Sequence, residues 1–385
     1  MLTQPHHIPR TGTGNPQTTP FEDKWDVLSQ RGLVPSFNQS RVWLTAQSDH
    51  LSAANSREII VDDRDEPSAV AGLTPRLILP LIPLKTAVTW DTGFLFSGTP
   101  LLDKTNPSSA LKGLLNQSQK SLKAHAVIFK KVQQAQEFTQ TIEQLATSSA
   151  PKHKTFNQHE RAALFCNSDY DTWFNENVSR KRKKEYRRLR NRLADQGKLV
   201  STTWDTSMPI TPWLDEFLAL EKSGWKGKGG TAIACNKGQE GQLRQAVELM
   251  AQNGSLLFWK ITLDGEVIAS MFGFMENKQA WLGKMAFDET KSQFSPGVLV
   301  ILDATKDLLD NPLGYPELKL VDSSADANHP MINNIWRDRI QIADYLIAAP
   351  NTSDLLFKVI IALETFRLTA RDFIKQIYHK IKKTG

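Results

Sequence analysis

Apolar and polar positions alternate along residues 254–322 in a way that predicts a meander of strands. Three apolar runs have strand length, and they cover 255–261, 266–275 and 279–287. The pair Asp264-Gly265 separates the first two runs and supplies the positive-φ position that a tight hairpin needs. After the third run, apolar spacing from Val298 predicts a helix, and a further strand is expected from Leu318.

The expected helix begins with features that suit an anion. Ser295-Pro296-Gly297 stands directly before Val298, so proline and glycine occupy the first turn. Amide groups at a helix start have no partner within the helix, and the helix dipole favours negative charge there. We therefore expect the N–H groups around Ser295, Gly297, Val298 and Leu299 to bind a pyrophosphate.

Residues 21–150 form a first half that loosely repeats the strand and helix order of residues 151–345. Strands are expected at 59–61, 77–84, 94–96 and 124–130, and helices at 111–122 and 137–145. The prolines in 77–84 place that strand at an edge or a bulge. This half has no counterpart of Ser295-Pro296-Gly297, so the site is expected in the second half. Residues 1–20 are polar and are predicted to be a disordered tail.

The second half opens with a strongly basic helix. A short strand is expected at 161–166, helices at 170–177, 211–222 and 240–252, and a strand at 198–203. Ser179 can cap a helix running to Gln196, whose cations surround an apolar stripe. The cations form either a solvated face or a collar for CoA phosphates, an anionic polymer or an acidic lipid surface. Nucleic acid is disfavoured, because only Tyr186 offers a stacking ring.

The segment 346–385 is predicted to carry a long amphipathic helix from Asp354 to Lys382. Apolar residues recur there every three or four positions, and basic residues become more frequent toward the end. Packing against the body or a partner is the first interpretation. Docking on an acidic membrane surface is the alternative.

Composition narrows the class of protein. The chain has 385 residues and a formal net charge of +6, which is compatible with anionic ligands but does not itself indicate nucleic acid. Two cysteines, no signal-peptide pattern and no apolar run long enough to span a membrane favour a cytoplasmic protein. No spacing typical of metal ligands appears, so no metal is expected. A Walker A loop is also absent from the sequence, which argues against phosphoryl transfer.

Several segments together resemble a known enzyme family. They are the basic run 179–184, the segments 221–227 and 264–269, Phe294-Ser295-Pro296-Gly297, and Asp322-Ser323-Ser324-Ala325. In this order they resemble GNAT-type acyltransferases, closest to the CelD-like branch of cellulose biosynthesis and more remotely to FemAB-type peptidyltransferases. The resemblance implies a mixed α/β (α+β) GNAT fold with two GNAT-like halves, the first degenerate. It also implies transfer of an acyl group, typically acetyl from acetyl-CoA, to an amine or hydroxyl.

Acyl transfer needs a base, a stabilised oxyanion and a leaving thiolate. Asp322, His329 and Glu221 are the candidate bases, with capping or a surface loop as the alternatives for the first two. Lys284 is a candidate contact for a phosphate or a carbonyl, or a strand residue facing solvent. Trp225 and Lys226 lie among glycines and are expected in a mobile loop over the acceptor, or in a plain connector.

The sequence leaves three functions open. The main hypothesis is an acyl-CoA-dependent transferase acting on a small-molecule or saccharide acceptor in polysaccharide or envelope synthesis, which only the resemblance suggests. A FemAB-like transferase would take an aminoacyl group from tRNA, with the basic helix as its docking surface. A binding protein that keeps the fold without catalysis is the third.

Overall fold

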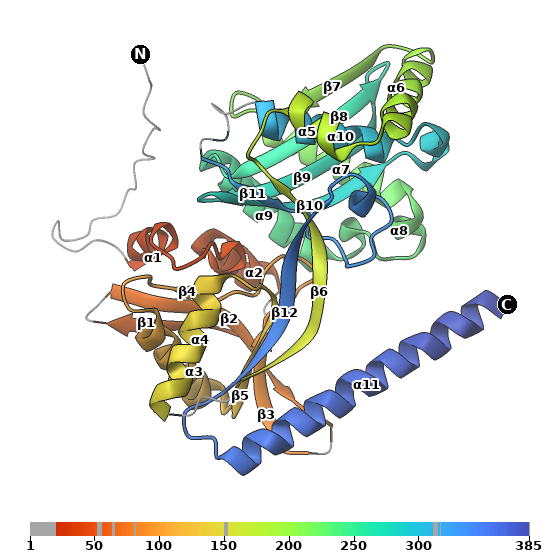
Figure 1. The fold of residues 1–385 in the computed structure, drawn as a ribbon. Helices are drawn as coiled ribbons and strands as arrows, with labels where there is room; N and C mark the ends of the chain where they lie inside the picture. The colour runs from red at the N-terminus through yellow and green to blue at the C-terminus, as the bar shows by residue number, and fades with distance from the viewer. Residues whose placement is uncertain are drawn as a thin grey trace, which may run out of the picture.

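One twelve-stranded sheet runs through both halves of the chain (Figure 1). The computed structural model describes residues 21–51, 56–63, 66–80, 82–149, 153–310, 315 and 317–384, so the predicted tail 1–20 lies outside them. The strand order is β1-β2-β3-β5-β12-β6-β11-β10-β9-β8-β7, with β4 paired to β2. Only the pairs β3/β5 and β10/β11 are parallel.

The first half contributes one end of the sheet and the helices on it. Its strands are β1 (Arg57–Asp63), β2 (Glu66–Leu77), β3 (Lys85–Thr89), β4 (Leu101–Leu102) and β5 (Ala126–Gln133). Its helices are α1 (Phe21–Gln30), α2 (Arg41–Leu51), α3 (Pro107–Leu122) and α4 (Gln136–Ser149). The side chain of Asn106 accepts the Ser109 amide and Pro107 follows it, which explains why α3 begins there.

The second half contributes the other end. Its strands are β7 (Leu199–Thr203), β8 (Leu256–Leu263), β9 (Glu266–Glu276), β10 (Gln279–Phe287) and β11 (Leu320–Asp322). Its helices are α5 (Tyr170–Asn177), α6 (Arg180–Ala194), α7 (Ile210–Ser223), α8 (Trp225–Lys228), α9 (Lys237–Gln252) and α10 (Pro296–Asp310). Asp264 and Gly265 both have positive φ, as the predicted hairpin requires. The meander and the helix after it are therefore confirmed.

The two halves repeat one topology and exchange their last strands. In each half a helix, α3 or α10, connects the two strands of the parallel pair. Strand β6 (His153–Phe165) follows α4 in sequence but pairs with β11, whereas β12 (Asp338–Ala348) follows β11 and pairs with β5. β6 and β12 also pair with each other along the long central ribbon in Figure 1. The expected two similar halves are thus present, joined by this exchange.

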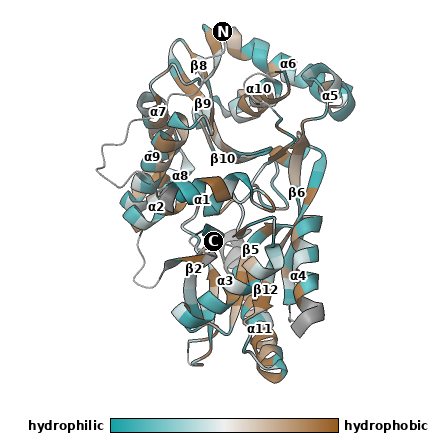
Figure 2. Ribbon diagram, turned by 90° about the vertical axis from the view of Figure 1, so that its left-hand side faces the viewer, coloured by the Kyte–Doolittle hydropathy of each residue, from teal (hydrophilic) through white to brown (hydrophobic). Residues whose placement is uncertain are grey.

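Helices cover both faces of the second half. One face packs residues of α5, α6 and α10, and the other packs residues of α2, α7 and α9. The residues that these helices contribute to the two cores are apolar. Figure 2 colours each residue of the helices and strands by its hydropathy. The second core also takes in Phe37, Trp43, Phe94 and Phe96 from the first half. The halves therefore share a core as well as a sheet.

Several predicted elements of the chain were wrong. A strand was expected at 77–84, but β2 ends at Leu77 and β3 begins at Lys85. Pro80 and Pro83 lie between these two strands, where they cannot donate to a strand pair. Residues 94–96 form a buried loop instead of a strand. The short strand expected at 161–166 is the end of the longer β6, and β12 was not predicted. The division of the chain at 151 and 346 stays a prediction, since β12 extends past residue 346.

The chain ends in α11 (Asp354–Thr384), which confirms the expected C-terminal helix. Its first turns pack on β3, β5 and β12 through Phe357 and Ile360, and the rest extends away from the body (Figure 1). Among the described helices, none is long and apolar enough to cross a membrane.

Candidate functional site

Strands β10 and β11 run together for only three residue pairs and then diverge. The last pair is Trp281 with Asp322, after which β10 continues to Phe287. Beyond the pair, β10 carries a bulge in which Gly283 and Lys284 face a single residue of β9. A Cβ at Gly283 would lie 2.3 Å from the ring of Phe272, so the bulge requires glycine. Bulges redirect backbone amides, which makes this point of the strand suited to bind a carbonyl oxygen.

Helix α10 begins beside this divergence, but most of its predicted amides are occupied. Val298 and Leu299 both donate to the carbonyl of Ser295, and the Ser295 amide donates to Ser292 at 2.9 Å. The Gly297 amide lies in the first turn of α10, directly after Pro296. A Cβ at Gly297 would lie 3.1 Å from Phe287 and 3.2 Å from Met285, so the helix start packs closely on β10. Three of the four expected donors are thus engaged within the turn, and Gly297 remains the candidate donor.

Glu221, Trp225 and Lys226 meet the end of β10 in a small recess. Glu221 on α7 is buried, and one of its carboxylate oxygens accepts from Lys226 Nζ at 2.9 Å. The other oxygen accepts the Ile233 amide at 2.9 Å. The recess, which Met285 to Phe287 complete, encloses about 30 Å³, room for roughly one or two waters.

Trp225 and Lys226 belong to a short helix and not to the mobile loop that was expected. The Trp225 amide donates to Glu289 at 2.6 Å, and the Trp225 ring is 64% exposed. A Cβ at Gly227 would lie 1.7 Å from the Lys222 carbonyl, which fixes the turn between α7 and α8. The exposed Trp225 ring is therefore attached to a backbone that is fixed in place. This combination suits a residue that contacts a ligand.

Three lysines from the two halves lie near one another at the end of β10. Lys284 Nζ lies 5.1 Å from the centre of the buried Phe94 ring, and Lys131 donates to the Leu95 carbonyl at 3.0 Å. Lys226 contributes the third. Burial lowers the pKa of Lys284, the charge of Lys226 lowers it further, Glu221 opposes this, and Lys131 adds a smaller lowering. The local excess of positive charge favours an anionic ligand.

Asp322 lies in a buried ion pair. Its Oδ2 accepts from Arg161 of β6 at 2.9 Å, and its Oδ1 accepts the Ser324 amide at 2.8 Å. Arg161 also donates to the carbonyl of Phe96 at 3.2 Å, while its Nε is buried without a partner. Asp322 thus both caps the following turn and joins β11 to β6 and to the first half. Both of its oxygens are engaged.

His329 caps a turn on the segment after β11. Its Nδ1 is 3.4 Å from the amides of Met331 and Ile332, and its own amide donates to Asp326. These contacts lie within seven residues of the chain. No described contact brings His329 to Glu221 or Asp322.

Sequence reasoning missed Arg161, Phe94 and Lys131. Arg161 is the only charge in the apolar run 161–165, and a charge inside a strand pattern indicates a buried ion pair. Nothing in the sequence of the first half indicates that Phe94 contacts Lys284 of β10 or that Lys131 lies near it. Those contacts depend on the exchange of strands.

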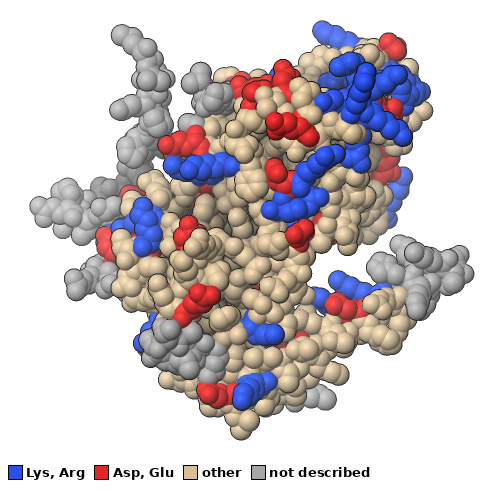
Figure 3. Space-filling model, viewed as in Figure 1, with Lys and Arg blue, Asp and Glu red and all other residues tan. Residues whose placement is uncertain are grey.

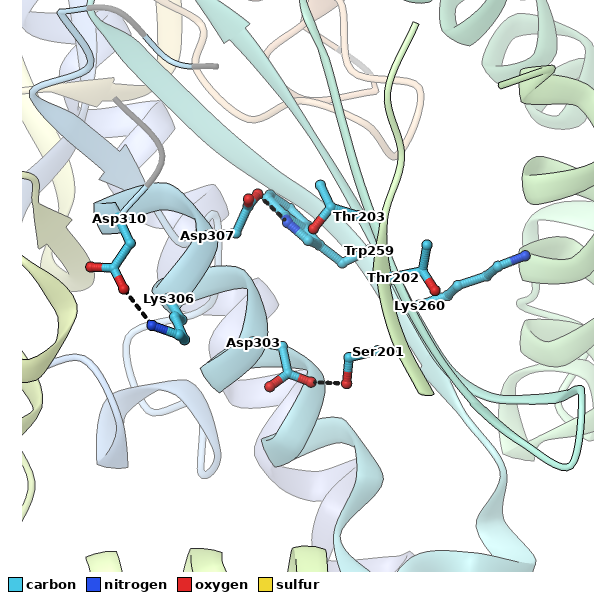
Figure 4. Close-up of a pocket in the computed structure, with 9 residues that line it drawn as sticks. All are labelled: Ser201, Thr202, Thr203, Trp259, Lys260, Asp303, Lys306, Asp307 and Asp310. Atoms are coloured by element: carbon cyan, nitrogen blue, oxygen red, sulfur yellow. Dashed lines mark hydrogen bonds and ion pairs between the residues drawn. The ribbon is translucent and has the colours of Figure 1, made fainter. Parts of the chain in front are cut away.

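A roomier pocket of about 410 Å³ lies elsewhere, between α10 and the strands β7 and β8 (Figure 4). Three aspartates of α10 line it, and all are engaged: Asp303 with Ser201 and Arg190, Asp307 with Trp259, and Asp310 with Lys306. Its charge has the wrong sign for CoA phosphates.

The basic helix α6 is exposed on the outer end of the second half, where blue side chains gather in Figure 3. Ser179 caps it, as predicted, and Leu189 and Leu193 are its buried stripe. Arg188 pairs with Glu185, whereas Arg180, Lys181, Lys184 and Arg187 are exposed.

Known proteins share parts of this design. Residues 180–326 match the profile described as an acetyltransferase (GNAT) domain. The chain contains a GNAT acetyltransferase domain. This domain includes the bulge of β10, the start of α10 and Asp322, and with it the protein is an acyltransferase of the GNAT type. No curated protein matches the chain.

Solved structures resemble the whole chain at low identity. A structure of FemX is 13% identical, with a TM-score of 0.53, over 86% of this chain and 94% of that one. The C-terminal domain of a putative lysylphosphatidylglycerol synthetase from Agrobacterium fabrum is 11% identical, with a TM-score of 0.54, over 89% and 94%. L-PGS from Bacillus licheniformis is 12% identical, with a TM-score of 0.51, over 89% and 96%. These likenesses show that the chain shares its fold with these proteins over most of its length. The expected GNAT domain is confirmed by the match of residues 180–326.

Proposed function

We propose that this GNAT domain transfers an acyl group, typically acetyl, from acyl-CoA to an amine or hydroxyl of a polar acceptor. The divergence of β10 and β11 beside the start of α10 carries the proposal. The position of the Gly297 amide in the first turn of α10 and the ammonium groups of Lys284 and Lys226 support an anionic donor there, with Ser295, Val298 and Leu299 shaping the turn. No described group of His, Cys, Asp and Glu residues is arranged to hold a metal.

The reaction that this arrangement supports is a direct transfer. The acceptor attacks the thioester carbon, the new N–C or O–C bond forms, and the bulge amides at Gly283 and Lys284 stabilise the oxyanion. The C–S bond then breaks, and the thiolate takes up the proton that the acceptor lost.

The acceptor would lie against Trp225 and Lys226, with Glu221 as the base. Of the three candidate bases, Glu221 alone shares a recess with the end of β10. Lys226 must release one oxygen of Glu221 for this role, which the half-exposed position of Lys226 permits. Asp322 then acts as a positioning residue through Arg161. A saccharide acceptor and the CelD-like branch rest only on the sequence resemblance.

The binding test uses a substitution at equivalent positions of the two halves. Gly297→Glu adds a carboxylate directly after Pro296 of α10, and Ser108→Glu adds one directly after Pro107 of α3. We expect acetyl-CoA to raise the thermal midpoint of the wild type and of Ser108→Glu, and not that of Gly297→Glu. Equal stabilisation of all three proteins would contradict the donor site.

The turnover test addresses the base. With acetyl-CoA and a panel of amines and amino sugars, Glu221→Gln should lower kcat by about 10²-fold or more with little change in the donor KM. Measuring free thiol release follows the leaving group directly. An unchanged kcat would assign the base elsewhere.

A second candidate function follows from α6. The exposed cations Arg180, Lys181, Lys184 and Arg187 form a surface suited to a polyanion, as an aminoacyl-tRNA-dependent transferase would need. Titration with charged tRNA separates this from the first proposal, because Lys181→Gln/Lys184→Gln should then weaken binding while Gly297→Glu should not. Stabilisation by neither acetyl-CoA nor charged tRNA would favour a non-catalytic binding protein.

A further inference from the structure

The C-terminal helix α11 has two apolar faces, and the body covers one of them. Phe357, Ile360 and Leu368 are buried on the covered face. On the same face Glu364 is 3% exposed and is paired with Arg76 at 2.8 Å and with Arg367 at 2.6 Å. This side of α11 is therefore fully accounted for by packing within the chain.

The second apolar face lies opposite and is open to solvent. Its side chains are Leu355 (75% exposed), Val359 (42%), Phe366 (62%), Phe373 (62%) and Ile377 (43%). Their spacings of four and seven residues place them on a single line along a helix of 3.6 residues per turn. The line is about 33 Å long at 1.5 Å per residue. Ile374, 65% exposed, widens it near its end.

A continuous apolar stripe of this length is larger than scattered surface residues explain. The apolar face of an ordinary surface helix turns toward its own core, and α11 already has such a face. The outer stripe must therefore serve a contact outside the described part of the chain.

Charge indicates which contact this is. From Arg371 to Thr384 the sequence holds five basic residues, Arg371, Lys375, Lys380, Lys382 and Lys383, against the single acid Asp372. A second copy of the helix in parallel orientation would bring like charges together, because no acidic residue follows Asp372 in the sequence. An anionic lipid surface complements both the charge and the apolar line.

We propose that the outer stripe of α11 lies in the interface of an anionic lipid bilayer and holds the transferase on that surface. The helix lies flat, because the stripe extends along one side of it for several turns and the exposed Lys358 lies beside the stripe. The body stays on the opposite side of the helix, attached through Phe357 and Ile360. This inference does not depend on the donor or the acceptor of the reaction.

Vesicle co-sedimentation of the full chain tests the proposal. The probes are phosphatidylcholine vesicles with and without about one-third phosphatidylglycerol. We expect binding to the anionic vesicles that weakens with salt, and an affinity lower by about tenfold or more for Phe373→Gln/Ile377→Gln. The control, Val27→Gln/Val200→Gln, removes two apolar side chains of moderate exposure from other surfaces and should bind like the wild type.

Three outcomes would overturn the proposal. One is equal binding by the wild type and Phe373→Gln/Ile377→Gln. Another is no binding to anionic vesicles by a wild type that shows a normal thermal midpoint. The third is a dimer in light scattering that becomes a monomer in Phe373→Gln/Ile377→Gln, which would assign the stripe to a second copy. An unchanged thermal midpoint of the variant shows that the fold is intact.

Discussion

Each half has a parallel strand pair at the same point of the shared topology, β3/β5 in the first and β10/β11 in the second. The halves differ in the region where the two strands of the pair diverge. In the first half, Thr89 Oγ1 donates to Ile128 and accepts the Lys130 amide, and Gly98 donates to the Lys130 carbonyl at 2.8 Å. These bonds bridge the point where β3 and β5 diverge. In the second half, no hydrogen bond joins 282–287 to 323–326 among the described residues.

The gap between the diverging strands is closed in the first half, and the segment that follows β3 explains this. Residues 94–100 all lie buried, and Phe94 and Phe96 pack with Phe274 and Trp281 of the second half. The segment that follows the first strand of the parallel pair is thus an interface in one half and the approach to α10 in the other. This comparison predicts one site per chain, lined in part by the inactive half.

The largest effect on the free energy of unfolding is expected from removing the guanidinium of Arg161, which lies where β10 and β11 diverge. Arg161→Met leaves the Asp322 carboxylate buried without its charged partner, which typically costs 3–5 kcal/mol. Urea unfolding measures the loss. The double substitution Arg161→Met/Asp322→Leu should recover much of it, because no unpaired charge remains buried. A loss below about 1 kcal/mol for Arg161→Met would show that this pair does not hold β6 to β11.

The next largest loss of stability is expected at Gly98, whose amide bonds to Lys130 where β3 and β5 diverge. A Cβ at Gly98 would lie 2.2 Å from the Lys130 carbonyl oxygen, so Gly98→Ala must displace backbone. We expect a loss of about 3 kcal/mol in the free energy of unfolding, with the acetyl-CoA affinity of the folded protein unchanged. Lys104→Ala, at an exposed position of the same connection, is the control. Loss of donor affinity without loss of stability would place a ligand in the first half instead.

The contrast between halves also explains what the sequence could predict. Periodicity located β8, β9, β10, α5 and α10, because each is a local pattern with its own turn or cap. It could not predict how β6 and β12 pair, because β6 pairs with β11 and β12 pairs with β5, across the two halves. An apolar run does not indicate which strand it pairs with.

The candidate site shows the same limit. The group Glu221, Trp225 and Lys226 was found from a local segment, and it does meet β10. The amides of Val298 and Leu299 were expected to be free, but a left-handed Ser295 turns its carbonyl to accept both. The residue types alone do not predict this left-handed conformation of Ser295.

A carboxylate between the halves should make stability depend on pH. Glu276 of β9 accepts the Ser36 amide at 2.6 Å, and burial raises its pKa to about 7. A raised pKa means that the native state binds the proton more tightly than the unfolded state. The stabilisation from this carboxyl group is therefore complete below about pH 4.5 and is lost as the pH rises through 7, by about 3 kcal/mol.

Glu276→Gln keeps an oxygen for the Ser36 amide and removes the charge. Its free energy of unfolding should exceed that of the wild type at pH 8 and match it near pH 4.5. Chemical unfolding at both values checks this. A wild-type stability that rises between pH 5 and 8 by an amount that Glu276→Gln removes would reverse the sign and contradict the interpretation.

The smallest effect on stability is expected in the segment that follows the parallel pair. This segment is α4 in the first half and residues 323–337, which contain no α-helix, in the second. His329 caps the turn at 332 through its Nδ1, so His329→Ala should cost about 1 kcal/mol or less. His329→Asn, whose side-chain oxygen can accept the same amides, should restore most of it. If His329 were instead the base, His329→Ala would lower kcat by orders of magnitude and would not be rescued by asparagine. Because the ring's described contacts stay within its own turn, we expect kcat to change less than about threefold, which would leave the second half's chemistry to the recess between α7 and β10.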